Sequence, residues 1–256
     1  MSDLTSSNDP QLGDLLEEGA TLEAVKREDS LKSAKTLMMA KDYSQLPVMS
    51  GPRSLKGYID WKSIADAYTY GRSKEPVGSS METDPPLMRA NKPLVKAIKL
   101  IGRRGFVLVQ GHDDTVQGIV TSYDLAVWLR SIVEPILLIG GIETKIRQLI
   151  ISGLGAEPIV SNLDIEVEPG TDLNDVLTLG ACVRVLQSES TWSQISKGDL
   201  DRRVFVRHME SVNLIRNRLL HFRDDKLSGE ELGILRNMGT MMAKVEASSK
   251  NATTRE

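Results

Sequence analysis

The sequence predicts an α/β N-terminal half followed by an all-α C-terminal half. A segment of about 60 residues that we interpret as helix, strand, turn, strand and helix occurs twice between residues 20 and 130. After residue 132 the apolar residues recur mainly at helical spacing. We therefore expect a flexible leader (1–19), a first repeat (20–75), a linker (76–87), a second repeat (88–132), a helical domain (133–245) and a disordered tail (246–256).

Length and composition restrict the class of protein. A chain of 256 residues is long enough for two domains with separate cores, and 40% apolar with 26% charged residues is typical of a globular protein. The net charge of −3 excludes a chain-wide basic surface that would attract nucleic acid. The single cysteine, Cys182, cannot form an internal disulfide, which favours a reducing, cytoplasmic compartment.

Two further classes of site are not expected. Three histidines and one cysteine show no metal-ligand spacing, so no metal is predicted. No apolar run reaches the length that spans a bilayer, because Glu134, Pro135 and two glycines interrupt the longest one, 132–142. Membrane association is therefore not expected.

The two repeats have matching elements. The first copy predicts a capped helix over 29–38, strands over 43–49 and 55–59, and a helix over 60–68. The second copy predicts a capped helix over 91–100, strands over 105–109 and 116–120, and a helix over 121–129.

These elements carry short motifs that resemble those of a CBS-domain pair, the Bateman-type module of two βαββα-like repeats. The matching stretches are Leu46-Pro47-Val48, Gly57-Tyr58-Ile59 and Gly118-Ile119-Val120. The ligand motif of that family, glycine, two apolar residues, Ser or Thr, two residues and Asp, is complete from Gly118 to Asp124.

This resemblance implies that the second repeat binds an adenine nucleotide (AMP, ADP or ATP) through Gly118, Thr121 and Asp124. Thr121 would contact phosphate at a helix N-terminus, where anions are stabilised, and Asp124 would accept hydrogen bonds from the ribose hydroxyls. In the first repeat, Asp60 stands at the hydroxyl position and Ser63 at the acid position, so no second complete site is expected. The alternative is that Asp60 and Thr121 are only helix N-caps.

The C-terminal half predicts helices over 137–150, 173–186, 192–195, 199–221 and 227–245, with irregular chain over 151–170. Asn217 and His221 are four residues apart and share a helix face, and Arg216 adjoins them. An imidazole suits proton transfer near neutral pH, and a guanidinium suits a phosphate. Between residues 202 and 223 there are six arginines and one acid, Glu210, and a local excess of positive charge favours an RNA backbone. The alternative, which an arginine run taken alone favours, is a solvated helix face.

The order Arg216-Asn217, three residues and His221 resembles the signature of HEPN-family ribonucleases. An opening helix with Ile142-Glu143 and Ile146-Arg147 resembles the same family. The resemblance implies a metal-independent endoribonuclease that leaves 2′,3′-cyclic phosphate ends and acts in bacterial stress or phage defence as a toxin. Its catalytic residues would be Arg216, Asn217, His221 and Glu143, with Arg218 and Arg223 binding RNA.

One histidine per chain is too few for separate acid and base roles, so the resemblance also implies a homodimer or higher homo-oligomer with a composite site. A CBS-like pair would then regulate that site when a nucleotide binds. Simpler interpretations remain open: Glu143 could form an i, i+4 pair with Arg147, and Arg216 could pair with Asp224 or Asp225. The protein would then be a non-catalytic nucleotide-sensing module that binds RNA or protein.

Overall fold

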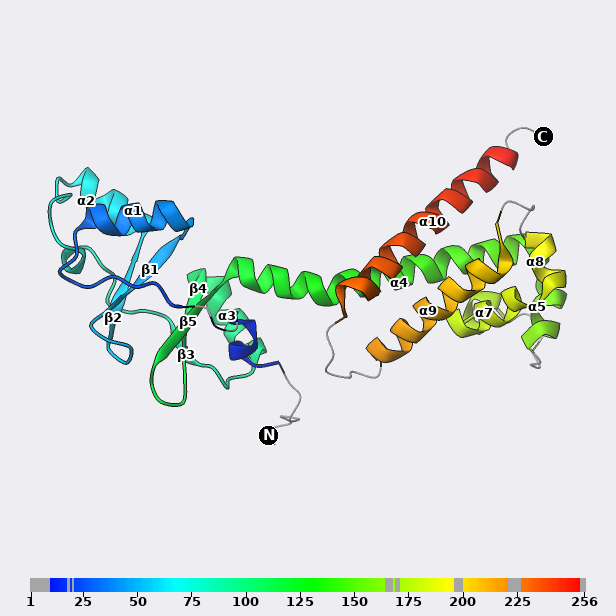
Figure 1. The fold of residues 1–256 in the computed structure, drawn as a ribbon, viewed down its shortest axis with the longest axis horizontal. Helices are drawn as coiled ribbons and strands as arrows, with labels where there is room; N and C mark the ends of the chain where they lie inside the picture. Colours follow the sequence, from blue (N-terminus) through cyan, green and yellow to red (C-terminus); the bar gives the residue numbers. More distant parts are fainter. Residues whose placement is uncertain are drawn as a thin grey trace. The chain divides into compact units, whose positions relative to one another are not determined.

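The computed structural model describes residues 10–17, 19, 21–163, 168, 171–195, 200–220 and 227–253. The chain forms two compact units, residues 1–129 and 130–256 (Figure 1). The boundary between the two units falls inside one long helix, α4 (Ser122–Leu154).

The first repeat contains a two-stranded antiparallel ribbon with two helices. Its elements are α1 (Leu31–Lys41), β1 (Gln45–Met49), β2 (Leu55–Asp60) and α2 (Trp61–Thr69). The Ser30 side chain caps α1 by accepting from the Ser33 N–H, as the sequence predicts for a capped helix. The apolar faces of α1 and α2 meet the ribbon in one core, which includes Leu31, Met38 and Ile59. The helices cover one side of the ribbon in Figure 1.

The second repeat adds a third strand to the same plan. Its elements are β3 (Leu87–Arg89), α3 (Leu94–Arg104), β4 (Phe106–Gln110), β5 (Val116–Thr121) and the start of α4. The short 3-10 helix η2 (Val77–Ser79) precedes them, and its Val77 is buried in the core of the first repeat. Strand β3 pairs in parallel with β4, and β4 pairs antiparallel with β5. In the first repeat, a single parallel bridge between Val25 and Val48 occupies the position equivalent to the pairing of β3 with β4. The predicted repeat is confirmed. Strand β3 was not predicted, and it spans the expected boundary between the linker (76–87) and the second repeat (88–132).

The two repeats share an apolar interface inside the first unit. Met49 from the first copy and Phe106, Leu108 and Val116 from the second are buried together, and the Tyr58 and Phe106 rings meet edge-on at 5.0 Å between centroids. The tyrosine thus belongs to the contact between the copies.

The expected flexible leader is wrong over residues 10–17. Leu12, in the 3-10 helix η1 (Leu12–Leu15), is fully buried in the core of the second repeat. Its N–H donates to the Lys92 carbonyl at 2.9 Å. This segment therefore belongs to the first unit, because a distant apolar core buries its leucines.

Helix α4 continues through the residues that were expected to interrupt it. Pro135 is buried inside the helix, and two consecutive glycines, 140 and 141, follow in the same element. Among the described residues, α4 is long and apolar enough to cross a membrane by length and composition, with 17% of its most apolar window buried. The expectation that no run reaches that length is thus corrected, since only two charged residues fall in the window.

The described part of the second unit consists of helices and short connections. After α4 come α5 (Ala156–Leu163), α6 (Leu173–Val176), α7 (Leu179–Gln187), α8 (Glu189–Ile195), α9 (Arg202–Leu220) and α10 (Gly229–Thr253). Three predictions are corrected: α5 occupies chain that was expected to be irregular, residues 177 and 178 break the helix predicted over 173–186, and α10 runs into the expected disordered tail. The predicted Ser228 cap of the last helix is confirmed. Its Oγ accepts from the Glu231 N–H at 3.2 Å, and the Ser228 N–H donates to Glu231 Oε2 at 2.8 Å.

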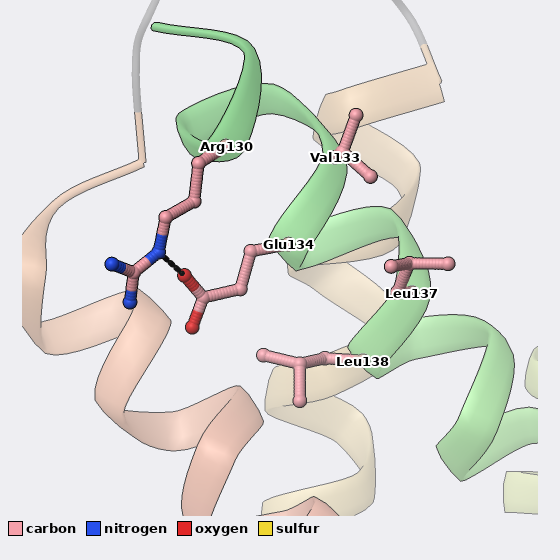
Figure 2. Close-up of a pocket in the computed structure, with 5 residues that line it drawn as sticks. All are labelled: Arg130, Val133, Glu134, Leu137 and Leu138. Atoms are coloured by element: carbon pink, nitrogen blue, oxygen red, sulfur yellow. Dashed lines mark hydrogen bonds and ion pairs between the residues drawn. The ribbon is translucent and has the colours of Figure 1, made fainter. Parts of the chain in front are cut away.

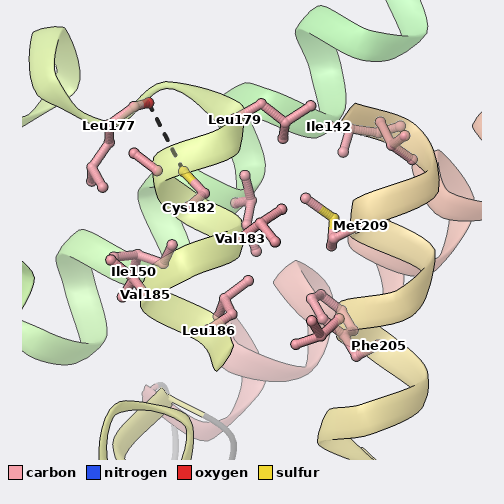
Figure 3. Packing of buried hydrophobic residues seen from close by; sticks show 14 of the residues in the cluster. Ile142, Ile150, Leu177, Leu179, Cys182, Val183, Val185, Leu186, Phe205 and Met209 are labelled. Atoms are coloured by element: carbon pink, nitrogen blue, oxygen red, sulfur yellow. Dashed lines mark hydrogen bonds between the residues drawn. The ribbon is translucent and has the colours of Figure 1, made fainter. Parts of the chain in front are cut away.

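One core joins these helices. Helix α7 lies against α4 and α9, and Cys182 is among the side chains buried between them (Figure 3). The thiol donates a hydrogen bond to the Leu177 carbonyl at 3.9 Å, and burial raises its pKa to about 12. This cysteine is a core residue.

Candidate functional site

Thr121 and Asp124 form a closed pair where β5 ends and α4 begins. The N–H and the hydroxyl of Thr121 each donate to Asp124 Oδ2 at 2.7 Å. The Asp124 N–H donates to Thr121 Oγ1 at 3.3 Å. The reciprocal bonds are those of a helix cap, so the capping interpretation holds for Thr121. Both hydrogen bonds that Thr121 donates to the carboxylate go to Oδ2.

The first repeat makes the same bond with the two residue types exchanged. The N–H and hydroxyl of Ser63 each donate to Asp60 Oδ1 at 2.7 Å. Here Ser63 is buried, with 6% of its surface exposed, whereas Thr121 and Asp124 are both partly exposed. The capping interpretation therefore holds for Asp60 as well. Of the two pairs, the one in the second repeat is accessible to a ligand at both residues.

The space into which a side chain at position 118 would extend is filled by Leu16. A Cβ at this position would lie 2.5 Å from Leu16 Cδ2, so the glycine makes room for the N-terminal segment. In the first repeat, a Cβ on Gly57 would lie 2.1 Å from the Glu82 carbonyl oxygen. Both glycines of the repeated motif therefore allow another segment to cross the strand closely.

Arg104, which the sequence reasoning missed, ends α3 beside this helix start. The Ser122 N–H donates to the Gly105 carbonyl at 3.0 Å, which joins the end of α3 to the start of α4. Arg104 Nη1 donates to Asp84 Oδ2 at 3.0 Å. This bond is the main cause that raises the pKa of Arg104, and Tyr58 adds to it. A basic residue directly before a helix-ending glycine was the available sequence signal.

A separate open pocket of about 420 Å³ lies between the repeats of the first unit. It is lined by residues 22, 24–26, 49–52, 116 and 117, with Lys26 as its cation. Thr121 and Asp124 are not part of this lining. The predicted nucleotide residues Thr121 and Asp124 therefore lie outside this pocket.

Glu143, predicted to orient Arg216, makes other contacts. Its Oε1 accepts from Arg147 Nη2 at 2.6 Å and from the Leu179 N–H at 3.2 Å, and its side chain is 14% exposed. Arg147 also donates to the Leu177 carbonyl at 2.6 Å. The simpler interpretation, an i, i+4 pair with Arg147, is therefore present, and it fixes the start of α7 against α4.

The predicted catalytic and RNA-binding residues are only partly described. Arg216 Nη1 donates to Asn217 Oδ1 at 3.2 Å near the end of α9, where Asn217 is exposed. Arg218 Nη1 lies 2.6 Å from Glu231 Oε1, which links α9 to α10. His221 and Arg223, with Asp224 and Asp225, lie outside the described residues. The structure thus brings Arg216 and Asn217 together, and it engages Arg218 in an ion pair inside the unit.

Metal ligands do not gather in the part of the chain that the structure describes: no group of three or more His, Cys, Asp or Glu there could hold an ion.

No family model matches the sequence, and no curated protein matches it significantly. Solved structures of CBS-domain pair proteins match the N-terminal half. A hypothetical conserved protein of Geobacillus kaustophilus is 24% identical with a TM-score of 0.44, over 48% of this chain and 97% of that one.

Two further matches are similar in extent. A putative acetoin utilization protein, AcuB, of Vibrio cholerae is 20% identical with a TM-score of 0.45, over 49% of this chain and 94% of that one. CBSX2 of Arabidopsis thaliana, solved in complex with AMP, is 22% identical with a TM-score of 0.40, over 45% and 93%. These matches cover the first unit, so the resemblance of the helical unit to HEPN ribonucleases stays a prediction.

Proposed function

We propose that the first unit binds an adenine nucleotide at Thr121 and Asp124. The observation that supports this proposal is a contrast between the two repeats. In the first repeat the hydroxyl–carboxylate hydrogen bond involves a buried serine, whereas in the second repeat both residues of the hydrogen-bonded pair are partly exposed. A ligand can therefore exchange hydrogen bonds with the second pair without opening the core.

The chemistry of the pair fits a nucleoside phosphate. The Thr121 hydroxyl stands at the N-terminus of a 33-residue helix, where an anion is stabilised. Asp124 would accept from ribose hydroxyls through Oδ1, which leaves its capping bonds intact. Arg104 would supply a cation beside the phosphate, in competition with Asp84.

Calorimetric titration with AMP, ADP and ATP tests this part. We expect binding by the wild type and a loss of affinity of about tenfold or more for Asp124→Asn, since a hydrogen bond to a charged group is worth about 1.5–3 kcal/mol. Asp60→Asn is the matched control, because it changes the equivalent acid of the first repeat and should bind as the wild type does. Equal affinity for the two variants would contradict this assignment.

We further propose that the helical unit is a metal-independent endoribonuclease that the nucleotide regulates. His221 would take the proton of the RNA 2′-hydroxyl as its oxygen attacks phosphorus. The bond to the 5′-oxygen would break, and that oxygen would leave with a proton supplied by the second copy's His221. Arg216 would stabilise the charged phosphorane, and the Asn217 carboxamide, bonded to Arg216, would orient it. The products would be a 2′,3′-cyclic phosphate and a free 5′-hydroxyl.

The arrangement of charges at the end of α9 supports this part. Arg216 bonds to a neutral carboxamide and not to an acid in the described structure, so its charge stays available for a phosphate. Arg218 is bonded to Glu231, which makes it a weaker candidate for RNA binding than Arg216. A role in bacterial stress or phage defence follows from the resemblance alone.

RNA cleavage in the presence of EDTA tests the second part. Wild type, His221→Ala and Arg216→Ala are compared with and without each nucleotide, and the ends of the products are analysed for cyclic phosphate. Cleavage by wild type alone, changed by nucleotide, is the expected result. If a folded protein never cleaves but still binds nucleotide, the alternative applies: a nucleotide-sensing module that binds RNA or protein.

A further inference from the structure

A short segment of the first unit is fixed at both ends to strands of different repeats. At its start, Glu82 exchanges two backbone hydrogen bonds with Tyr58 of β2, at 2.8 and 3.0 Å. At its end, the Pro86 carbonyl accepts from the Leu108 N–H of β4 at 2.7 Å. We call residues 82–86 the inter-repeat segment, because it contacts a strand of each repeat.

The middle of the inter-repeat segment is stiff. Asp84 precedes two consecutive prolines, Pro85 and Pro86, which fix their own φ near about −65° and keep the preceding residue extended. With both ends of the segment bonded, the Asp84 side chain stays in the same neighbourhood even when its own hydrogen bonds open. Asp84 therefore acts on its partner at the high effective concentration of a tethered group.

The partner of Asp84 is Arg104, at the end of α3. Arg104 Nη1 donates to Asp84 Oδ2 at 3.0 Å, and Nη2 donates to the Asp84 carbonyl. The Arg104 side chain is 35% exposed and the Asp84 side chain is 91% exposed, so an anion from solvent can reach the guanidinium. The same guanidinium thus serves the inter-repeat segment and is open to a ligand.

An ion pair that holds two helices together is less accessible. In the second unit, Glu134 accepts from Arg130 at 3.2 Å within α4 (Figure 2). Arg236 of α10 binds the same carboxylate at 2.5 Å, and the Glu134 side chain is only 24% exposed. Asp84, by contrast, lies in a connecting segment and is almost fully solvated. An exposed pair of this kind adds little stability, so it can exchange partners at low cost.

Arg104 lies next to the predicted nucleotide residues. Phe106 is the cross-strand partner of Thr121, so the two side chains lie on the same face of the sheet. On that face Tyr58 meets the Phe106 ring edge-on, and Tyr58 also contributes to the raised pKa of Arg104. The Arg104 guanidinium and the Thr121 hydroxyl are therefore both close to the Phe106–Tyr58 contact.

We infer that Asp84 is an internal competitor of the ligand phosphate: it occupies Arg104 in the ligand-free protein, and a nucleotide must displace it. This inference rests on the proposed nucleotide site. Carboxylates and phosphates both take bidentate hydrogen bonds from a guanidinium, so one anion excludes the other. Displacement frees the inter-repeat segment from α3, which makes this segment the part of the first unit that responds to the ligand.

The size of the effect follows from the strength of the ion pair. An exposed pair closes with an equilibrium constant of about 1.5–5. The apparent dissociation constant of a ligand is its intrinsic value divided by the fraction of molecules that are competent to bind. Asp84 therefore weakens the binding of a phosphate-bearing ligand by about 2.5- to 6-fold.

Calorimetric titration of the full chain with AMP and with adenosine tests this competition in Asp84→Asn. We expect the affinity for AMP to rise about 2.5- to 6-fold, while the affinity for adenosine, which has no phosphate, stays at the wild-type value. Asp113→Asn is the matched control. Asp113 is also an exposed acid, 3.4 Å from Arg53, but it precedes β5 and lies at the opposite end of that strand from Thr121. This variant removes the same charge and should leave the affinity for AMP unchanged.

A double-mutant cycle with Arg104→Gln identifies the group for which the two anions compete. In the Arg104→Gln background, Asp84→Asn should no longer change the affinity for AMP, because the shared guanidinium is absent. A gain that persists in this background would overturn the inference, as would an equal gain for adenosine.

The outcomes for Asp84→Asn and Asp124→Asn separate this inference from the proposed site. Unchanged AMP affinity in Asp84→Asn, with weaker binding by Asp124→Asn, would overturn the competition and support the Thr121–Asp124 site. Tighter binding by Asp84→Asn, with unchanged binding by Asp124→Asn, would support the competition and contradict that site. Binding of AMP by neither wild type nor Asp84→Asn would overturn both.

Discussion

Truncation of Glu143 distinguishes a structural carboxylate from a catalytic one. Its Oε1 accepts from a guanidinium and from the Leu179 N–H, and the side chain is largely buried. Glu143→Ala removes a hydrogen bond to a charged group, worth about 1.5–3 kcal/mol, and leaves a partly buried N–H at the start of α7 without that acceptor. We expect the free energy of unfolding of the second unit to fall by about 2–3 kcal/mol.

Urea unfolding followed by far-UV circular dichroism measures this change, with each unit allowed its own transition. Glu143→Gln keeps an acceptor oxygen without the charge, so we expect about half the loss. Glu189→Ala is the matched control: Glu189 also faces an arginine, at 3.7 Å, but its side chain is 89% exposed. Such a pair is worth no more than about 1 kcal/mol.

Unfolding of Glu143→Ala at the wild-type urea concentration would refute this reasoning, because the carboxylate would then not hold α7 on α4. If that variant is as stable as wild type yet fails to cleave RNA that wild type cleaves, the catalytic role predicted for Glu143 is favoured.

Three further predictions use other contacts. Gly57→Ala should lower the free energy of unfolding of the first unit by about 3 kcal/mol or more, because the alanine Cβ would lie 2.1 Å from a carbonyl oxygen. Gly102→Ala, in open space on α3, should raise the same free energy by up to about 1 kcal/mol. Urea unfolding measures both changes. Arg218 lowers the pKa of the Glu231 carboxyl group. The stabilisation that the Glu231 carboxylate gives to the folded state is therefore present above pH 4.5, the ordinary pKa, and is lost as the pH falls through the lower pKa of the folded state. The difference in melting temperature between wild type and Glu231→Gln should narrow from pH 6 to pH 3. The Cys182 thiol, with its pKa raised to about 12, should react with iodoacetamide at pH 8 only after unfolding, and rapid labelling of the native protein would contradict its burial.

Local signals in the sequence predicted most elements of the first unit. Caps such as Ser30, glycine-containing turns and runs of β-branched residues depend on near neighbours in the chain, so these signals are visible without the fold. Two features could not be predicted in this way. Leu12 is buried by a core formed some 80 residues later, and the three-residue β3 gains its partners only when β4 is in place.

The helical unit was predicted less well because prolines, which usually interrupt helices, lie inside two of its helices. Pro135 lies within α4, and Pro158 lies in the first turn of α5, where a proline needs no N–H partner. Pro135 was expected to interrupt the apolar run, and the segment that contains Pro158 was expected to be irregular. For the candidate site, adjacency along the chain predicted the Arg216–Asn217 contact, but the partners of Glu143 and Arg218 depend on how α7 and α10 pack.

The exchanged pairs, Asp60 with Ser63 and Thr121 with Asp124, bear on how a duplicated module diverges. Either order of acid and hydroxyl starts its helix with a 2.7 Å bond, so exchanging them need not disturb folding. One copy can therefore lose its ligand chemistry while selection for stability leaves the helix start unchanged. A duplicated ancestor with two equal ligand sites could in this way become a protein with one site. The two repeats would keep the same backbone arrangement at the helix start, although only one of them could still bind the ligand.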